Sequence, residues 1–237
     1  MITTWRAAPA FNMALDQALL ESVGAAPTLR FYTWKPETLS LGYFQRVADV
    51  PAVEKTRVVV RRITGGGAIH HANELTFSIA ADLTHPLYAG PIAESYARVH
   101  RALAVALADF GVTAQMRGDR ALASDREDTG MCFHASTALD LVWNERKGVG
   151  SAQRRKHGRV LHHGSIKLDT TPLEGDIATL APSAPGLSAE ALAPHVRAAF
   201  ERELGLSFEA SVPDFDERQR TKELAPQFVD PTFVRRR

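Results

Sequence analysis

The sequence predicts an α+β fold that forms a single domain over residues 1–237, and three observations support this prediction. Two stretches, 11–19 and 96–110, carry apolar residues at the spacing of an amphipathic helix. The stretch 74–80 instead alternates apolar and polar residues, which is typical of a β-strand with one buried face. Neither an internal repeat nor a convincing linker separates these elements, so we expect them to share one hydrophobic core.

The first half of the chain is expected to contain one helix and four strands. The helix over 11–19 is predicted because Phe11, Leu15 and Leu19 fall on one face. Apolar runs bounded by turn residues predict strands over 29–33, 39–44, 57–62 and 74–80. We expect the last two strands to pair as a hairpin, whose connection would be the glycine- and histidine-rich segment between them.

The second half is expected to open with the helix over 96–110, which ends at Gly111. The stretch 113–131 is polar and is predicted to be a mobile surface loop. Strands are predicted over 138–143, 147–153 and 160–168, the first two joined at Asn144-Glu145 and the third interrupted by His162-His163-Gly164. A final helix is expected from its N-cap, Ser188, to Gly205.

The composition is that of an ordinary globular protein, with 45% hydrophobic and 23% charged residues and a formal net charge of +1. A charge this small gives no global field that would favour nucleic acid. No apolar run is long enough to span a membrane, and the N-terminus lacks a secretory signal. The single cysteine forbids an intrachain disulfide, which fits a reducing compartment, so a cytoplasmic protein is expected.

A run from Arg61 to His71 is the most informative part of the chain. Its three consecutive glycines, Gly65, Gly66 and Gly67, lack Cβ atoms and allow backbone to approach a ligand closely. Arg61 and Arg62 add planar donors suited to carboxylates or phosphates. The run fits neither the dinucleotide-binding nor the P-loop glycine pattern. An ordinary glycine-rich hairpin connection is the alternative that these residues alone leave open.

Cys132 and Lys147 are candidate reactive groups. A lone cysteine is usually a small buried hydrophobe, but Cys132 follows a polar loop, with His134 two residues on and Lys147 within the next two strands. A cation near a thiol favours the nucleophilic thiolate. Lys147 opens a strand of small residues against which a substrate could lie, although a surface lysine at a hairpin end is the alternative. Neither His70-His71 nor His162-His163 has partners at zinc-ligand spacing, so no metal site is expected.

Several motifs in one order resemble the lipoate-protein ligase and octanoyltransferase family. They are Phe11-Asn12-Met13-Ala14-Leu15-Asp16, Leu41-Gly42-Tyr43-Phe44-Gln45, the run from Arg61 to His71 with Glu74-Leu75-Thr76, Arg146 to Gln153, and His163-Gly164-Ser165. The resemblance covers nearly the whole chain. It implies the fold shared with biotin protein ligase and related to class II synthetases, in which a mixed, largely antiparallel sheet is flanked by helices.

The cysteine-dependent octanoyltransferase branch is the most similar part of that family, because Cys132-Phe133 stands where its nucleophile does. The resemblance then implies that Cys132 takes an octanoyl group from acyl carrier protein as a thioester. A lysine of a lipoyl domain, in glycine-cleavage H protein or a 2-oxoacid dehydrogenase E2, would receive it. Lys147 would stabilise the oxyanion. No cofactor, metal, nucleic acid or membrane is expected to take part.

The remaining implied site residues would bind substrate. They are Arg61, Arg62, Gly65, Gly66, Gly67, His71, Gly150, Ser151, Ala152, His163 and Gly164. The glycines would line an acyl tunnel. His71 would orient the carbonyl, move a proton or only pack. The two arginines would be divided between the site and the surface that meets the carrier protein. Two other activities stay open, an ATP- and magnesium-dependent lipoate-protein ligase and an amidotransferase between lipoyl-domain proteins. We expect no accessory C-terminal domain, and we expect a monomer.

Overall fold

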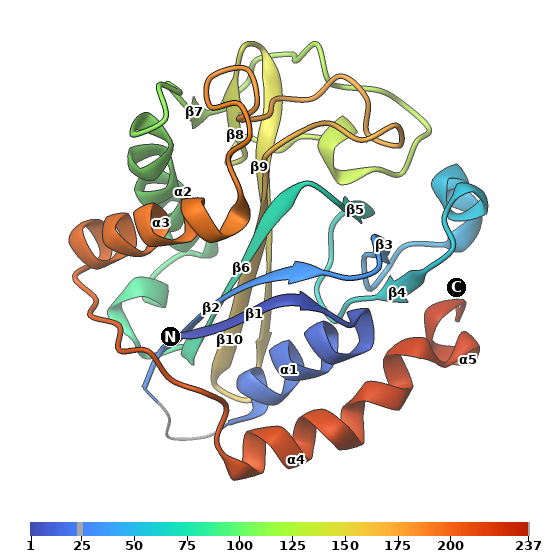
Figure 1. Ribbon diagram of the computed structural model, residues 1–237, viewed down its shortest axis with the longest axis vertical. Coiled ribbons are helices and arrows are strands. Elements are labelled where there is room, and N and C mark those ends of the chain that lie inside the picture. The colour runs from blue at the N-terminus through green and yellow to red at the C-terminus, as the bar shows by residue number, and fades with distance from the viewer. Residues whose placement is uncertain (23–25, 237) are drawn as a thin grey trace.

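The computed structural model describes residues 1–22 and 26–236, which form two β-sheets and a set of surrounding helices (Figure 1). The strands are β1 (Ile2–Ala7), β2 (Thr28–Trp34), β3 (Thr38–Leu41), β4 (Val59–Arg61), β5 (Ile69–His71), β6 (Glu74–Asp82), β7 (Gln115–Met116), β8 (Leu141–Trp143), β9 (Arg146–Lys156) and β10 (Arg159–Lys167). The α-helices are α1 (Pro9–Glu21), α2 (Ile92–Ala108), α3 (Ala189–Leu204), α4 (Phe215–Leu224) and α5 (Pro231–Val234). Short 3-10 turns cover Val47–Asp49, Pro51–Lys55, Pro86–Tyr88, Cys132–His134 and Ala225–Val229.

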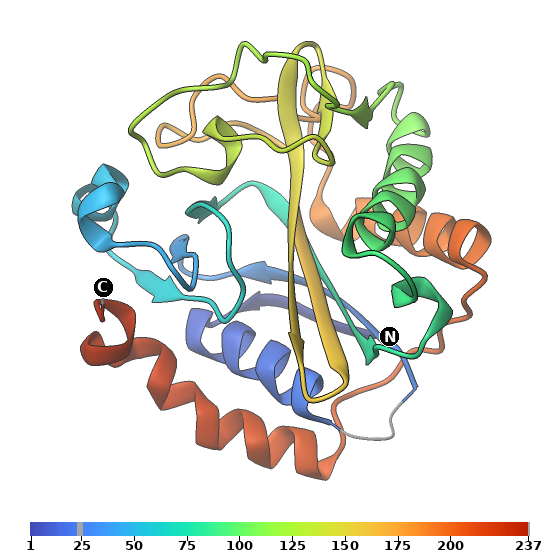
Figure 2. The same cartoon turned by 180° about the vertical axis from the view of Figure 1, so that it is seen from behind.

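The larger sheet has seven strands in the order β1-β2-β6-β10-β9-β8-β7. Its β1–β2 pair is parallel and its other pairs are antiparallel. The long β9–β10 hairpin crosses the back of the molecule (Figure 2). Because β8 pairs with β9 only between Arg146 and Val149, the second half of β9 has a sheet partner on one side alone.

Helices cover both faces of this sheet. On β6, Ile79 packs in the cluster that holds α2 and α3, while its neighbour Ala80 packs with α1. On β10, Val160 packs with α2 and α3 and its neighbour Leu161 packs with α1, because successive side chains of a strand point to opposite faces. Among residues 1–22 and 26–236, none of the helices combines the length and the apolar character that a bilayer crossing requires.

The predicted hairpin between 57–62 and 74–80 is wrong. β4 pairs in parallel with β3, and β5 pairs with β3 on its other side, so these three strands form a separate small sheet. β6 belongs to the large sheet, between β2 and β10. Alternation identified β6 as a strand, yet eight of its nine residues are buried. Its polar residues face buried polar partners instead of water, since Ser78 donates to Asp16.

Most of the other predicted helices and strands are present, although their first and last residues differ from the predicted ones. The Asn144-Glu145 turn joins β8 to β9, and Ser188 caps α3, which ends at Gly205 with a positive φ of 64°. The predicted interruption at residues 162–164 is wrong, because β10 runs through them without a break. Residues 115–116 of the predicted loop form β7. The helix predicted as the last is followed by α4 and α5.

Candidate active site

Cys132 and Lys147 meet at the end of the β8–β9 hairpin. The lysine Nζ lies 3.4 Å from the Cys132 Sγ and donates a hydrogen bond of 2.8 Å to the Cys132 carbonyl oxygen. The cysteine begins the 3-10 turn Cys132–His134, whose preceding residue, Met131, bridges to Ala68 after the glycines. The lysine therefore holds both the sulfur and the backbone of the turn that carries it.

A buried carboxylate fixes the lysine. Asp140 Oδ2 lies 2.9 Å from Lys147 Nζ, and the lysine is only 1% exposed. Burial alone would lower the pKa of Lys147, but the adjacent Cys132 sulfur and the Asp140 carboxylate outweigh burial and raise this pKa above its ordinary value. Lys147 is therefore a charged ammonium at neutral pH, suited to stabilise negative charge on a sulfur or an oxygen beside it.

Two glycines allow the sulfur and the amine to approach each other. A Cβ on Gly150 would lie 2.9 Å from Lys147 Cε, 3.1 Å from its Nζ and 3.3 Å from Cys132 Sγ. A Cβ on Gly67 would lie 2.8 Å from the Cys132 backbone nitrogen. Both contacts are closer than ordinary van der Waals packing, so each glycine leaves room for Cys132 and Lys147.

Replacing Gly150 with alanine is therefore expected to displace the Lys147 ammonium. If the chain catalyses the acyl transfer that the motif resemblance implies, its rate should fall by about 10-fold or more, because misplacing a catalytic group by about 1 Å is costly. The rate should be compared with that of Gly158→Ala. Gly158 has a φ of 75°, and a Cβ at this position would have no neighbour within 4 Å. That control should lose stability through backbone strain but keep its transfer rate. Equal rates in the two variants would contradict the packing argument.

An apolar cavity runs inward from Cys132. Its empty space, counted out to the open mouth and including solvent there, is about 410 Å³. Its walls are Met13, Tyr32, Trp34, Arg62, Gly66, Ile69, His71, Thr76, Cys132, Gly150, Ser151, Ala152, His163, Gly164 and Ser165. Eight of the eleven residues predicted to bind substrate are in this set, as is the predicted catalytic Cys132. A cavity of this kind suits a hydrocarbon chain.

A wider and more polar depression adjoins the cavity, and we call it the vestibule. Its lining residues are Gly65, Gly66, Gly67, Tyr96, Cys132, Ala135, Thr137, Leu139, Asp140, Lys147, Ser151, Ala152 and Gln153. Cys132, Gly66, Ser151 and Ala152 line both spaces. The sulfur thus lies where the apolar cavity meets the vestibule, and a group attached to it can extend inward while its carbonyl stays beside Lys147.

His163 connects the glycine turn to the helix α1. Its Nε2 lies 2.6 Å from Thr64 Oγ1, and its Nδ1 lies 3.3 Å from Asp16 Oδ2. Asp16 is buried and also accepts from Arg30 at 2.7 Å and from Tyr32 at 2.8 Å. Burial alone would raise the pKa of Asp16, but Arg30 and His163 outweigh it and lower this pKa. The imidazole therefore positions the turn.

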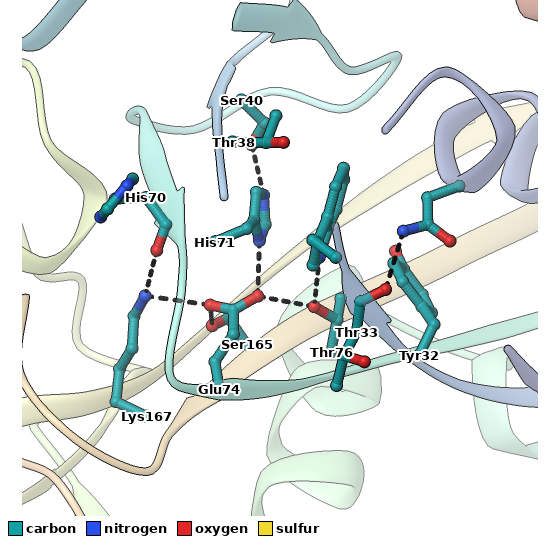
Figure 3. A network of polar contacts seen from close by, with 12 residues as sticks. Tyr32, Thr33, Thr38, Ser40, His70, His71, Glu74, Thr76, Ser165 and Lys167 are labelled. Atoms are coloured by element: carbon teal, nitrogen blue, oxygen red, sulfur yellow. Dashed lines mark hydrogen bonds and ion pairs between the residues drawn. The ribbon is translucent and has the colours of Figure 1, made fainter. Parts of the chain in front are cut away.

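His71 belongs to a second buried network, which Figure 3 shows. Its Nδ1 lies 2.5 Å from Glu74, its Nε2 lies 2.7 Å from Ser40 Oγ, and its ring stacks on Trp34 at 4.0 Å. Lys167 reaches the same carboxylate at 2.9 Å. Since both ring nitrogens are engaged, the geometry favours the packing role among those considered for His71.

This burial of histidines makes the stability of the fold depend on pH. Burial lowers the pKa of His71 to about 4, and it also lowers the pKa values of His100 and His162. The unfolded chain, whose histidines titrate near pH ~6.5, binds more protons than the folded chain just below that pH. The free energy of unfolding is therefore expected to fall by roughly a few kcal/mol as the pH drops from about 6.5 to 5.

Urea unfolding midpoints measured across this pH range test the dependence. Asp16 and Glu74 do not contribute to it, because their lowered pKa values keep both carboxylates ionised there. The variant His162→Gln, which removes one titrating group, should show a flatter profile. A wild-type midpoint that stays constant down to pH ~5 would contradict the expectation.

The two arginines of the glycine run have different positions. Arg62 borders the cavity and donates at 2.7 Å to each of the Gly65 and Gly67 carbonyls. Arg61 lines neither space and is fully buried, with donated bonds to the carbonyls of Gly42 at 2.7 Å and Val234 at 2.9 Å. The expectation that one arginine meets a carrier protein at the surface is wrong, because both guanidinium groups are buried against backbone.

Sequence reasoning missed two parts of the site. Asp140 was not singled out, because nothing in its local pattern distinguishes it from a surface turn residue. His100 was also missed, since it lies within a helix whose apolar spacing did not include it. Asp16 stood in a quoted motif without a role, yet it is the buried acceptor for His163.

Known proteins resemble this chain in both sequence and structure. Residues 8–180 match the family model of the lipoyl protein ligase A/B catalytic domain. The octanoyltransferase LipM of Moorella thermoacetica is 42% identical over 186 residues, which are 73% of this chain and 67% of that protein. The octanoyltransferase LipM of Carboxydothermus hydrogenoformans is 41% identical over 172 residues, covering 68% and 62% respectively. The chain thus spans about two thirds of the length of these curated relatives.

A solved structure extends the likeness to the whole fold. A bi-partite lipoate protein ligase from Thermoplasma acidophilum, described with its E2 lipoyl domain, superposes with a TM-score of 0.77 at 19% identity. The superposition covers 99% of this chain and 95% of that chain. The predicted fold class, a mixed and largely antiparallel sheet flanked by helices in the manner of biotin and lipoyl ligases, is therefore confirmed.

Proposed function

Because the chain belongs to the family of lipoyl protein ligase A/B catalytic domains, we propose that it is an octanoyltransferase that forms an acyl thioester on Cys132. One observation supports this most strongly. The sulfur lies 3.4 Å from a buried ammonium, at the point where an apolar cavity meets the vestibule. The relatives are octanoyltransferases by name, which agrees with the transfer of an octanoyl group.

In the first step, the Cys132 thiolate attacks the thioester carbon of an octanoyl carrier protein. A bond forms from Cys132 to the acyl carbon, the bond to the carrier's sulfur breaks, and that sulfur leaves as a thiolate. The Lys147 ammonium binds the Asp140 carboxylate and the Cys132 carbonyl, and Cys132 Sγ and the Ala135 carbonyl oxygen each lie 3.4 Å from its Nζ. The ammonium can donate a hydrogen bond to the oxyanion of the tetrahedral intermediate and so stabilise it.

In the second step, a lysine of an apo lipoyl domain attacks the acyl-enzyme. The C–S bond to Cys132 breaks as an amide bond forms. Exchange between two thioesters is nearly balanced, and formation of an amide from a thioester is downhill. The complete transfer therefore needs no nucleotide and no metal, and its partners are the acyl carrier protein and the lipoyl domain, in a protein that acts as a cytoplasmic monomer.

Intact mass spectrometry tests the proposal. The protein is mixed with octanoyl carrier protein, with and without ATP, and an octanoyl adduct on Cys132 is expected in both cases. Addition of apo lipoyl domain should then discharge the adduct. Absence of an adduct, together with ATP-dependent exchange of pyrophosphate in the presence of lipoate, would overturn the proposal in favour of ligase chemistry. Discharge of an acyl group taken from a second lipoyl-domain protein, without carrier protein, would identify an amidotransferase.

A further inference from the structure

A line of hydrogen-bonded side chains leads from the vestibule into the core beneath α2. Ser151, on β9, borders both the cavity and the vestibule. Its Oγ lies 2.7 Å from His100 Nε2 and 3.0 Å from His162 Nε2. Both imidazoles are fully buried, whereas Ser151 is partly exposed. A group in the vestibule can therefore reach His100 through the serine hydroxyl.

The direction of the hydrogen bond between Ser151 and His100 is fixed by a backbone carbonyl. His100 Nδ1 lies 2.5 Å from the carbonyl oxygen of Leu139, which can only accept. In the neutral imidazole, Nδ1 therefore carries the hydrogen, and Nε2 has a lone pair. Ser151 must donate its hydroxyl hydrogen to His100 Nε2.

A guanidinium fixes the direction at the other end of the line. Arg155 can only donate, so the group that it contacts at 3.1 Å is the amide oxygen of Gln153. The amide nitrogen of Gln153 then faces His162 Nδ1 at 3.3 Å, and His162 donates from Nε2 to Ser151. Ser151 thus receives one hydrogen bond, gives its own hydrogen to His100 and keeps one lone pair.

The second step of the proposed transfer requires a proton acceptor in the vestibule, because the attacking nitrogen becomes positively charged. Lys147 is already an ammonium and cannot accept a proton. The Asp140 oxygen nearest to it is bound both by this ammonium at 2.9 Å and by the Thr137 backbone at 2.6 Å. Of the described vestibule residues, Ser151 is the one whose hydroxyl hydrogen already points to a neutral imidazole.

The surroundings of His100 suit it to receive a proton for a short time. Burial lowers the pKa of His100, and Lys147 adds to this effect, so its imidazole is neutral at physiological pH. The Leu139 carbonyl and the Asp140 carboxylate act in the opposite direction and would stabilise a transient imidazolium. His162 and Tyr96 are its other titratable neighbours, from β10 and from its own helix.

We propose that Ser151 and His100 form a proton relay for the attacking lysine, a role that rests on the proposed octanoyl transfer. The neutral amine bonds to the acyl carbon, and the resulting N–H⁺ gives its proton to Ser151 Oγ as the serine hydrogen moves to His100 Nε2. The C–S bond then breaks, and its electron pair leaves on the Cys132 sulfur beside Lys147. His100 returns the proton through Ser151 to water in the vestibule.

Single-turnover kinetics on preformed octanoyl-Cys132 test the relay. His100→Gln keeps an acceptor for Ser151 but cannot bind a proton, and Ser151→Ala removes the connection. Each should slow transfer to the lipoyl-domain lysine by about 10²-fold. His100 lines neither the cavity nor the vestibule, so His100→Gln should form the adduct from octanoyl carrier protein at close to the wild-type rate. His162→Gln is the matched control, since it changes an equally buried imidazole outside the relay and retains a donor, and it should transfer at nearly the wild-type rate.

A second nucleophile separates the relay from mere distortion of the site. Hydroxylamine is far less basic than lysine, so its tetrahedral intermediate loses a proton to water without help. His100→Gln should therefore discharge onto hydroxylamine almost as fast as wild type. Equal slowing with both nucleophiles, or wild-type transfer to lysine, would overturn the relay while leaving the thioester mechanism intact. If wild type never forms the Cys132 adduct, the proposed function falls first, and the relay falls with it.

Discussion

Replacing Cys132 with alanine is expected to lower octanoyl transfer by about 10³-fold or more, because the acyl group then has no sulfur on which to reside. Serine should rescue little of this loss, since its hydroxyl is a far weaker nucleophile than a thiolate at neutral pH. The measurement is the rate at which octanoyl lipoyl domain forms from octanoyl carrier protein, followed by intact mass. The adduct on the enzyme should disappear in both variants.

The alternative for Cys132 is a wall of the cavity, and the same variants address it. Alanine removes little volume from a residue that is only partly buried, so the melting temperature should change little. Transfer that remained undiminished in Cys132→Ala would contradict a covalent role and leave the sulfur a lining group. Loss of transfer together with loss of folding would call for comparison through Cys132→Ser, which keeps the polarity and the size of the site.

The second large effect is expected at Lys147. Substitution by methionine, which keeps the length of the side chain but not its charge, should reduce the transfer rate by about 10²- to 10³-fold, or roughly 3–4 kcal/mol of transition-state stabilisation. The loss should appear in both half-reactions, because each passes through an oxyanion beside the same amine. Rapid-quench measurement of adduct formation and of adduct discharge would separate the two.

Lys147→Met also leaves the Asp140 carboxylate buried without its ion-pair partner, which can itself destabilise the fold by about 3–5 kcal/mol. The double variant Lys147→Met with Asp140→Asn removes both charges and is the appropriate control. It should recover much of the melting temperature but none of the activity. If activity returned with stability, the ammonium would have only a structural role.

Local patterns in the sequence predicted elements better than their partners. The alternation of Leu75, Phe77 and Ile79 identified β6, but a strand's period does not say which strand lies beside it, and the hairpin expected from proximity along the chain is absent. The polar positions between these residues suggested a face exposed to water. In the structure they face Asp16 and the cavity, so burial on both sides could not be read from polarity.

The C-terminal helix α4 shows a different limit. Only Glu217, Thr221 and Leu224 are buried in it, so apolar spacing gives almost no signal. A local signal does exist, since Asp214 and Glu217 form a capping box, which can be recognised from residue types alone. The partner of Lys147, by contrast, has no such signature, because Asp140 acquires its role only when the turn at Cys132 packs against the start of β9.

The local surroundings of Cys132 and Lys147 and the motif resemblance both name these residues as candidates, but neither shows that their side chains meet. Cys132 and Lys147 are fifteen positions apart, and their meeting depends on Gly150 and Gly67 leaving room on either side. Conversely, the same resemblance placed Arg61 among the groups that bind substrate. Its guanidinium instead binds the carbonyls of Gly42 and Val234, because a buried arginine with backbone acceptors needs no external anion.

The bond from Arg61 to Val234 spans 173 positions of the chain and has a consequence for biosynthesis. During translation, the arginine leaves the ribosome long before the carbonyl that it will bind has been made. The Arg61 guanidinium, which also binds the Gly42 carbonyl, therefore lacks one of its backbone acceptors until synthesis has passed Val234.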